Sequence, residues 1–418
     1  MISKTVSVSA NQRNALDRRG FLAKATATAA AGLTVVAPQS VRGTTANAKV
    51  TIGLVGCGGR GRWIADLFMK HGGYQLLATA DYFTDRANGA GDQFKVDAQR
   101  RYTGLAGYKR LLETAKPDAI VVESPPYFHP EHAMAGVEAG CHVYVAKPIA
   151  VDVHGCLTIG QSGRKATEKG LAFLVDFQTR ANEFYREAIR RVHAGAIGPL
   201  ASGEAVYYCG VTWGGDEAIK IDATNPENRL RAWGLDKVLS GDIITEQNIH
   251  ALDVATWIVN DQPLKAVGTC GKKGRKDSGT CNDHFAVIYS FPNDVVVSFA
   301  SKQYGTGYDD IGCRMFGPKG TIDTHYGGTV VVRGLGGGSY KGGNTGNIYS
   351  DGAVRNIADF HANILKKDFS NSTAAPSVRS NLTTILGRTA AYKRAEVTWD
   401  EMMRANEKFE FDTRGLKA

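Results

Sequence analysis

Short apolar runs alternate with amphipathic segments over the first part of the chain. The runs at 50–55, 75–80, 119–122, 142–145 and 171–175 have the length and composition of buried parallel strands. Between the first two runs, Ile64, Leu67 and Phe68 recur at helical spacing, and Gly72 and Gly73 end that pattern. Residues 132–139 form a second helical stretch. This alternation with short connections predicts a doubly wound parallel sheet, an α/β fold.

The pattern changes beyond about residue 180. Apolar residues alternate with polar ones over 285–291 and again over 295–299, and Pro-Asn-Asp at 292–294 separates the two stretches. This predicts a hairpin of an antiparallel sheet with one covered face. Helical stretches are expected at 182–193, 246–258, 357–366 and 382–393, and the glycine-rich segment 334–346 is expected to be a surface loop. The second half should therefore be an α+β domain with a largely antiparallel open sheet.

Length and charge narrow the class of protein. A chain of 418 residues is long enough for two cores. The formal net charge is +9, but residues 1–48 hold six basic residues and one acid, so the remainder carries only about +4 and a nucleic-acid partner is not expected. The seven cysteines are scattered without CxxC spacing, which argues against a zinc site or a disulfide scaffold and favours small buried side chains.

A glycine motif follows the first predicted strand. Gly56, Gly58 and Gly61 form GxGxxG between a strand and a helix, and Asp81 stands 20 residues past Gly61 at the end of the second strand. This is the pattern of a Rossmann dinucleotide site, in which the helix N-terminus binds phosphates and the acid binds ribose hydroxyls. Asp81 favours NAD, while Arg86 leaves NADP open. The alternative is a plain tight turn. The expected cofactor contacts are Gly56, Gly58, Gly59, Arg60, Gly61, Asp81, Ser124, Pro125, His129 and Lys147.

Candidate acid-base residues stand in three places. Ser124 to His129 and Lys147 each come directly after a predicted parallel strand, at the sheet edge where ligands bind. Glu246, His250 and Asp253 would share one face if residues 246–258 form a continuous helix, which suits general acid-base catalysis. One alternative is a structural helix start with a buried histidine. A Glu-His-Asp metal site lacks further ligands, and we expect no metal.

These segments resemble the glucose-fructose oxidoreductase and inositol dehydrogenase (Gfo/Idh/MocA) family. The resemblance rests on the GxGxxG turn, the Pro-x-x-x-His turn ending at His129, the Lys-Pro segment and the Gly-x4-Glu-x-Asn-x-His-x-x-Asp segment. It implies that Lys147 and His250 flank the reacting carbinol, with Glu246 where the family usually has Asp. The chain departs from the family's usual Glu-Lys-Pro, because Ala146 replaces the glutamate.

The N-terminal residues predict export. Arg18 and Arg19 precede Phe21, Leu22 and an Ala-rich stretch too short for a stable membrane span, and 46–48 is a candidate cleavage site. The paired arginines resemble a twin-arginine signal, which indicates a periplasmic or otherwise exported protein; the alternative is a disordered arm with a chance Arg-Arg. Because this route carries folded proteins, we expect a dinucleotide that is bound before export and then retained.

Three functions remain open on the sequence. The first is an NAD(P)-dependent oxidoreductase acting on a secondary hydroxyl of a sugar, glycoside or cyclic polyol. The second is a redox-neutral NAD-dependent glycosidase, and the third a non-catalytic dinucleotide-binding protein. The expected domains are a signal peptide at 1–48, a Rossmann domain at 49–178 and a substrate and oligomerisation domain at 179–418, the last suited to a homo-oligomer. Substrate contacts are expected from Gln178, Arg180 and Trp233, and Tyr207, Tyr208 and Trp213 are further candidates.

Overall fold

A computed structural model describes residues 49–211, 222, 224–275 and 279–418. The predicted export signal and Trp213 lie outside these residues. Within the described part of the chain, no helix is both long and apolar enough to cross a membrane.

The first sheet has six parallel strands in the order β3-β2-β1-β4-β5-β6. This confirms the predicted doubly wound sheet. The strand order reverses between β1 and β4, and in such sheets ligands bind at the carboxyl ends of the strands near that point. The strands are β1 (Val50–Val55), β2 (Tyr74–Asp81), β3 (Arg101–Thr103), β4 (Ala119–Val122), β5 (His142–Ala146) and β6 (Phe173–Asp176).

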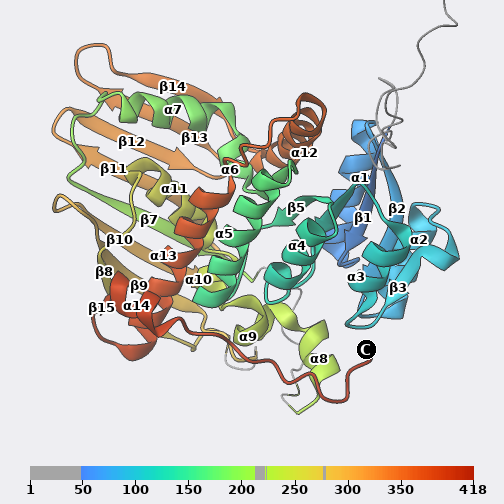
Figure 1. The fold of residues 1–418 in the computed structure, drawn as a ribbon. Coiled ribbons are helices and arrows are strands. Elements are labelled where there is room, and N and C mark those ends of the chain that lie inside the picture. The colour runs from blue at the N-terminus through green and yellow to red at the C-terminus, as the bar shows by residue number, and fades with distance from the viewer. Residues whose placement is uncertain (1–48, 212–221, 223, 276–278) are drawn as a thin grey trace, which may run out of the picture. The chain divides into compact units, whose positions relative to one another are not determined.

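Helices cover both faces of this sheet (Figure 1). Helix α1 buries Ile64 and Phe68 of the predicted apolar stripe, together with Ala65, while Leu67 is half-buried. Helix α5 begins where the Asp152 side chain accepts a hydrogen bond from the Gly155 N–H at 2.7 Å, a standard N-cap. The elements are α1 (Gly59–His71), α2 (Thr84–Gln93), α3 (Gly107–Arg110), α4 (His129–Glu138) and α5 (Val153–Glu168), with short helical turns at Ala98–Arg100 and Leu111–Ala115.

The second sheet has nine strands in the order β14-β13-β12-β11-β7-β10-β9-β8-β15. Neighbouring strands are antiparallel except β7 and β10, and β9 with β10 confirms the predicted hairpin. Phe285, Val287 and Tyr289 of β9 are buried, whereas Ile288 between them is exposed, so one face is covered. The strands are β7 (Ser202–Cys209), β8 (Lys265–Gly271), β9 (His284–Ser290), β10 (Val296–Gln303), β11 (Asp310–Gly317), β12 (Gly320–His325), β13 (Thr329–Gly334), β14 (Tyr340–Asn344) and β15 (Val397–Thr398).

The glycine-rich segment is not entirely a loop, which corrects the prediction. Residues Tyr340–Asn344 form β14 and pair with β13. Gly342 and Gly343 lie against the ring of Phe184, and a Cβ on either would come within 2.9 Å or 2.4 Å of that side chain. The glycines therefore permit a close approach of strand and helix here, a use that composition alone does not distinguish from a turn.

The last helices return to the first sheet. Ala353, Ile357 and Phe360 of α12 belong to the same core cluster as Phe68 and Tyr144 of the first sheet's layer. Helix α13 packs between α5 and β8, so it contacts both halves of the described unit. The remaining helices are α6 (Gln178–Ala181), α7 (Glu183–His193), α8 (Pro226–Arg231), α9 (Lys237–Ser240), α10 (Ile243–Glu246), α11 (Ile249–Val259), α12 (Ile348–Lys366), α13 (Ala374–Lys393) and α14 (Trp399–Ala405), with a turn at Trp233–Leu235.

After α14 the chain runs back to the first half of the molecule (Figure 1). The Phe409 N–H donates to Asp152 at 2.8 Å, and the Leu105 N–H donates to the Lys417 carbonyl at 3.0 Å. Phe411 is buried in a cluster with Phe83 and Leu230. Residues 407–418, hereafter the tail, thus join α8 to the edge of the first sheet.

The cysteines match the prediction. All seven lie in the described part of the chain and are free thiols, and all except Cys270 are buried.

Candidate active site

A cavity of roughly 940 Å³ opens at the carboxyl ends of the first sheet's strands. It is lined from both halves of the described unit, so residues far apart in sequence meet there. The predicted residues that line it are Gly56, Gly58, Gly59, Arg60, Gly61, Asp81, Ser124, Pro125, His129, Lys147, Trp233, Glu246 and His250.

The glycine turn has the shape that a dinucleotide site requires. Gly56 has φ 97°, and a Cβ there would lie 2.4 Å from the Ser124 nitrogen. A Cβ on Gly61 would lie 1.9 Å from the Gly56 carbonyl oxygen, whereas one on Gly59 would meet no atom within 4 Å. The turn is therefore closed toward the protein and open toward the cavity, where the N-terminal N–H groups of α1 can bind a pyrophosphate. The residues of this turn therefore fit the pyrophosphate of a dinucleotide.

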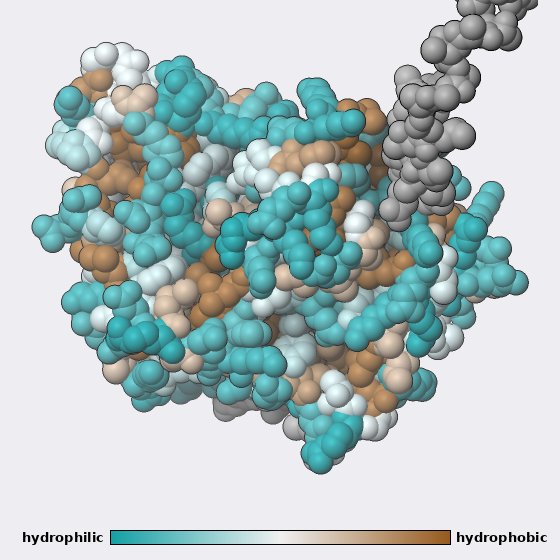
Figure 2. All heavy atoms as spheres, viewed as in Figure 1, coloured by the Kyte–Doolittle hydropathy of each residue, from teal (hydrophilic) through white to brown (hydrophobic). Residues whose placement is uncertain are grey.

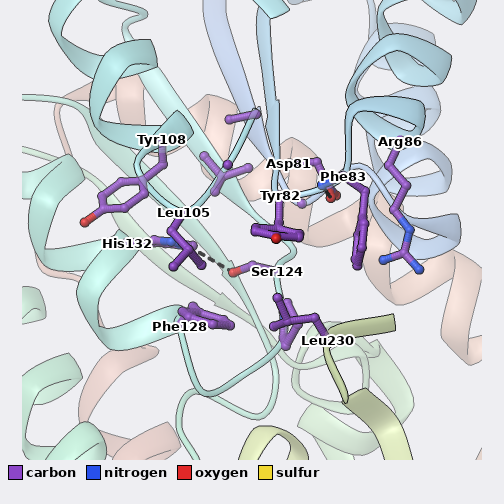
Figure 3. Close-up of a pocket in the computed structure, with 15 residues that line it drawn as sticks. Asp81, Tyr82, Phe83, Arg86, Leu105, Tyr108, Ser124, Phe128, His132 and Leu230 are labelled. Atoms are coloured by element: carbon purple, nitrogen blue, oxygen red, sulfur yellow. Dashed lines mark hydrogen bonds between the residues drawn. The ribbon is translucent and has the colours of Figure 1, made fainter. Parts of the chain in front are cut away.

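Asp81 lies at the far end of the same cavity, beside a second hollow of about 70 Å³ (Figure 3). Its carboxylate accepts hydrogen bonds from the Cys57 and Phe83 N–H groups at 2.7 and 2.9 Å, which fixes its orientation. Burial raises the pKa of Asp81, against these hydrogen bonds. The hollow is walled by Tyr82, Phe83, Leu105, Tyr108, Phe128 and Leu230. An apolar slot beside a fixed carboxylate suits an adenine ring and its ribose.

The His129 side chain connects the turn after β4 with the turn after β5. The His129 ring contacts the Ser124 carbonyl oxygen at 2.6 Å and the Pro148 carbonyl oxygen at 2.8 Å. Burial lowers the pKa of His129 to about 4, so the ring is neutral at pH 7 and donates through one nitrogen only. His129 thereby joins the turn after β4 to the turn after β5, where Lys147 stands.

Lys147 is buried against the second half of the site. Its Nζ donates to the Glu246 carbonyl oxygen at 2.7 Å, and the Glu246 Oε1 lies 3.4 Å away. Burial lowers the pKa of Lys147, and the Glu246 carboxylate opposes that shift. The resulting lysine is a better proton acceptor near neutral pH than an exposed lysine.

His250 lies at the start of α11 and not on the helix that contains Glu246. Helix α10 ends at Glu246 and α11 begins at Ile249, so the expected continuous helix is wrong. The His250 ring centroid is 5.0 Å from that of Tyr326, and its Nδ1 has no hydrogen-bond partner in the described part of the chain. Burial first, and then Lys147 and Arg60, lower the pKa of His250 well below its usual value. The imidazole is therefore neutral at physiological pH.

Asp253 does not orient His250, which corrects the shared-face hypothesis. Its carboxylate accepts three hydrogen bonds from Arg180, the shortest at 2.8 Å, and one from the Ser380 hydroxyl at 2.7 Å. The break between α10 and α11 removes Glu246 from the helical spacing, whereas Asp253 stays on α11 with His250 and is bound by Arg180 and Ser380 instead. Asp253 and Arg180 form instead a buried ion pair between α11 and α6.

Two of the three expected substrate residues do not line the cavity. Arg180 is held by Asp253, and the Gln178 amide donates to the Asp176 carboxylate at 2.8 Å. Trp233 does line it, as does Tyr207, whose hydroxyl donates to Gln247 at 2.9 Å.

The lining residues that sequence reasoning missed include Glu123, Tyr326 and Tyr349. The position of Glu123 directly before Ser124, at the end of a predicted strand, was the available signal. Tyr326 directly follows β12 and Tyr349 lies in the first turn of α12, and neither position gave a signal.

The Arg60 side chain contacts acids of the protein. Its Nε lies 2.9 Å from Glu123 and its Nη2 lies 2.5 Å from Asp176, and the guanidinium also donates to the Tyr349 hydroxyl. Tyr349 in turn stacks on Trp63. Arg60 thus lines the cavity while its charge is engaged by two carboxylates. Across the described ranges, no group of three or more His, Cys, Asp or Glu side chains is placed to hold a metal ion.

The chain was compared with protein families. A model described as "Oxidoreductase family, NAD-binding Rossmann fold" matches residues 50–177, and one described as "GFO/IDH/MocA C-terminal domain" matches residues 185–323. The chain belongs to the Gfo/Idh/MocA family of oxidoreductases. The expected α/β fold with a Rossmann domain, and NAD as the cofactor of that domain, are therefore confirmed.

Individual Gfo/Idh/MocA proteins are similar at low identity. "Inositol 2-dehydrogenase 3" of Saccharopolyspora erythraea is 28% identical over 279 residues, which cover 65% of this chain and 72% of that protein. "D-glucoside 3-dehydrogenase" of Escherichia coli is 29% identical over 184 residues, 41% of this chain and 47% of that one. The solved structure of a levoglucosan dehydrogenase with NADH and levoglucosan superposes with a TM-score of 0.66 at 17% identity, over 84% of this chain and 99% of that one. The chain is thus an oxidoreductase of the sugar and polyol dehydrogenase type.

Proposed function

We propose that this protein oxidises or reduces a secondary hydroxyl of a sugar, glycoside or cyclic polyol with a tightly held NAD. One observation carries the proposal: Lys147 and His250 line the same cavity as the glycine turn and Asp81. A substrate bound there would have its carbinol between two proton-transferring groups and a dinucleotide. Bound NAD would supply the hydride acceptor.

The chain's own residues would handle the proton. Lys147 in its neutral form accepts the hydroxyl proton as the carbon is oxidised, and returns it in the reverse direction. The Glu246 backbone carbonyl and carboxylate hold the amine in place. The neutral His250 offers a second donor or acceptor to the same hydroxyl or to its neighbour.

The substrate class is supported by the lining of the cavity and by the relatives. Trp233, Tyr207 and Tyr326 line the cavity beside His250, and aromatic faces with polar edges suit the alternating apolar and hydroxylated surfaces of a pyranose or inositol ring. The similar proteins are named as dehydrogenases of inositol, a glucoside and levoglucosan, all polyhydroxylated rings.

Tight retention of the cofactor is supported by the tail. Arg231 of α8 lies over the Phe83 ring at 4.0 Å and pairs with Asp85, and the Tyr82 hydroxyl donates to Glu227 of α8 at 2.8 Å. Leu230 of α8 lines the slot, and Phe411 of the tail packs in one cluster with Leu230 and Phe83. The second half of the chain therefore contributes α8 to the wall of the slot and the tail to the support of α8. Retention suits export of the folded holoprotein by the twin-arginine signal proposed in residues 1–48.

An absorbance titration tests the proposal. The purified full-length protein is scanned for bound reduced nicotinamide, then titrated with inositols, aldoses and methyl glycosides in its oxidised and reduced states. We expect the reduced-nicotinamide band to rise or fall stoichiometrically with one of these classes. Release of nitrophenol from a nitrophenyl glycoside without net change in that band would instead indicate the redox-neutral glycosidase. A protein that binds no nicotinamide dinucleotide would refute both.

A further inference from the structure

Three strands of the first sheet place Glu123, Ala146 and Asp176 in one row. Ala146 of β5 pairs with Asp176 of β6, and Val145 pairs with Val122 of β4, which directly precedes Glu123. Paired positions on neighbouring strands present their side chains to the same face of a sheet. The row therefore has a carboxylate on each side of a methyl group, and Lys147 is the residue that follows Ala146.

Arg60 bridges the two carboxylates of this row. Its guanidinium lies 2.9 Å from Glu123 and 2.5 Å from Asp176, while both acid side chains are fully buried and that of Arg60 is 25% exposed. Asp176 is further held by Asn356 and Gln178 at 2.8 Å each. Two carboxylates and one guanidinium carry one net negative charge when both acids are ionised. That is the charge that a single carboxylate at position 146 would supply.

Glu123 has one ion-pair partner, Arg60, in the described part of the chain. Its two carboxylate oxygens are buried, and Oε2 lies 2.9 Å from the Arg60 Nε. A buried ion pair with unsatisfied oxygens contributes little to stability, because desolvation offsets the attraction. The side chain also lines the cavity that contains Lys147. A role in the charge balance of the site accounts for this placement.

Charged and titratable groups surround Lys147 from both halves of the unit. Glu246 and His250 face it from the second half, and Arg60, Glu123, Asp176 and His129 interact with it electrostatically from the first. Burial raises the pKa of Glu123 to about 7. Glu123 is therefore fully ionised only at pH values well above 7.

We propose that Glu123, Arg60 and Asp176 form a positioning triad whose single negative charge sets the protonation equilibrium of Lys147, in place of a carboxylate at Ala146. The small side chain of Ala146 leaves room for the guanidinium between the two acids. This inference rests on the proposed function only in assigning proton transfer to Lys147. The triad itself does not touch the reacting hydroxyl.

The test measures the protonation of Lys147 without turnover. The purified full-length protein is labelled with trace acetic anhydride over a range of pH, and peptide mass spectrometry gives the midpoint of Lys147 acetylation. Glu123→Gln removes the negative charge, so we expect the midpoint to fall by about one pH unit or more, since a neighbouring charge shifts a pKa by about 1–3 units. Asp176→Asn should shift it in the same direction.

Moving the carboxylate along the row separates a charge effect from a structural one. Adding Ala146→Glu to Glu123→Gln should restore most of the wild-type midpoint, whereas adding Ala146→Gln, which has the same size without the charge, should not. Glu113→Gln, an exposed acid outside the site, should leave the midpoint unchanged. An unshifted midpoint in both Glu123→Gln and Asp176→Asn, or equal midpoints in the Glu and Gln double variants, would overturn the triad. Because acetylation needs no substrate, failure of hydride transfer with these shifts intact would count against the proposed function alone.

Discussion

Lys147 and His250 owe their proposed chemistry to burial in a shared cavity. Lys147 is 8% exposed and His250 5%, and burial is the largest cause of the lowered pKa at each. Both are therefore shifted toward the neutral form that can accept a proton. The residue types and their places at strand and helix ends were predictable from the sequence. Their partners were not predictable, because a helix break separates Glu246 from His250, and Asp253 pairs with Arg180, which is distant in sequence.

Removing either proton-transferring group should abolish turnover while sparing the cofactor. We expect Lys147→Ala and His250→Ala each to lower kcat by roughly 10²–10⁴-fold, the range for loss of a general acid-base group. Steady-state kinetics gives the loss, and fluorescence titration of NADH gives the binding constant. Glu113→Gln serves as the exposed control. An active Lys147→Ala protein would refute the assignment.

The pH dependence of kcat/KM should reflect the protonation of Lys147. Because the neutral amine is the base, kcat/KM for oxidation should rise with pH through the Lys147 pKa, which burial places below the usual value of 10.5. The Glu246 carboxylate opposes that lowering, so Glu246→Gln should move the alkaline rise to lower pH by about one unit. His250 should add no inflection above pH 6.5. A profile unchanged by Glu246→Gln would contradict this account.

At the scale of elements, α8 contributes Leu230 to the slot beside Asp81, and the tail packs against α8. Five strands of the first sheet, the hairpin of β9 and β10, and helices such as α1, α4 and α7 followed from periodicity, because buried faces impose their period on the sequence, whereas β3 and the other strands of the second sheet did not. The contacts of the tail with Tyr82 and Leu105 could not be predicted from periodicity. They depend on single hydrogen bonds and on burial of Phe411, which no local pattern indicates. The same holds for β14, whose pairing depends on the distant ring of Phe184.

Deleting residues 409–418 should release the cofactor faster. The deletion removes Phe411 from its cluster with Phe83 and Leu230, so we expect dissociation of NADH to accelerate about tenfold or more, equivalent to roughly 1.4 kcal/mol. Stopped-flow displacement of NADH measures the rate, and circular dichroism checks the fold. Arg414→Ala is the matched control, because that side chain is 90% exposed and pairs only with Asp412 of the tail. Equal rates in the deleted and full-length proteins would exclude a retaining role for the tail.

At the scale of the whole molecule, the basic charge does not belong to a single functional surface. About half of the net positive charge lies in residues 1–48, and in the face shown in Figure 2 hydrophilic residues surround small groups of exposed apolar ones. A positively charged segment at residues 1–48, followed by a remainder with a net charge of only about +4, fits an export signal better than a nucleic-acid surface.

The paired arginines should decide localisation. Arg18→Lys with Arg19→Lys keeps the charge but removes the guanidinium pair, so we expect export to fall nearly to zero while the folded, cofactor-bound protein accumulates in the cytoplasm. Cell fractionation with immunodetection measures the distribution, and Arg13→Lys is the control. Undiminished export of the double variant would rule out the twin-arginine proposal.

Transfer of isotope from substrate to cofactor tests the central claim most directly. The protein is loaded with NAD and incubated with myo-inositol or a methyl glucoside deuterated at its carbinol carbons, and the released dinucleotide is analysed by mass spectrometry. Hydride exchange in the Lys147 cavity predicts one deuterium in the nicotinamide ring with the wild-type protein, and labelling at least about 100-fold slower with Lys147→Ala. A dinucleotide that stays unlabelled with every deuterated polyol and glycoside, or labelling at the wild-type rate in Lys147→Ala, would contradict the account.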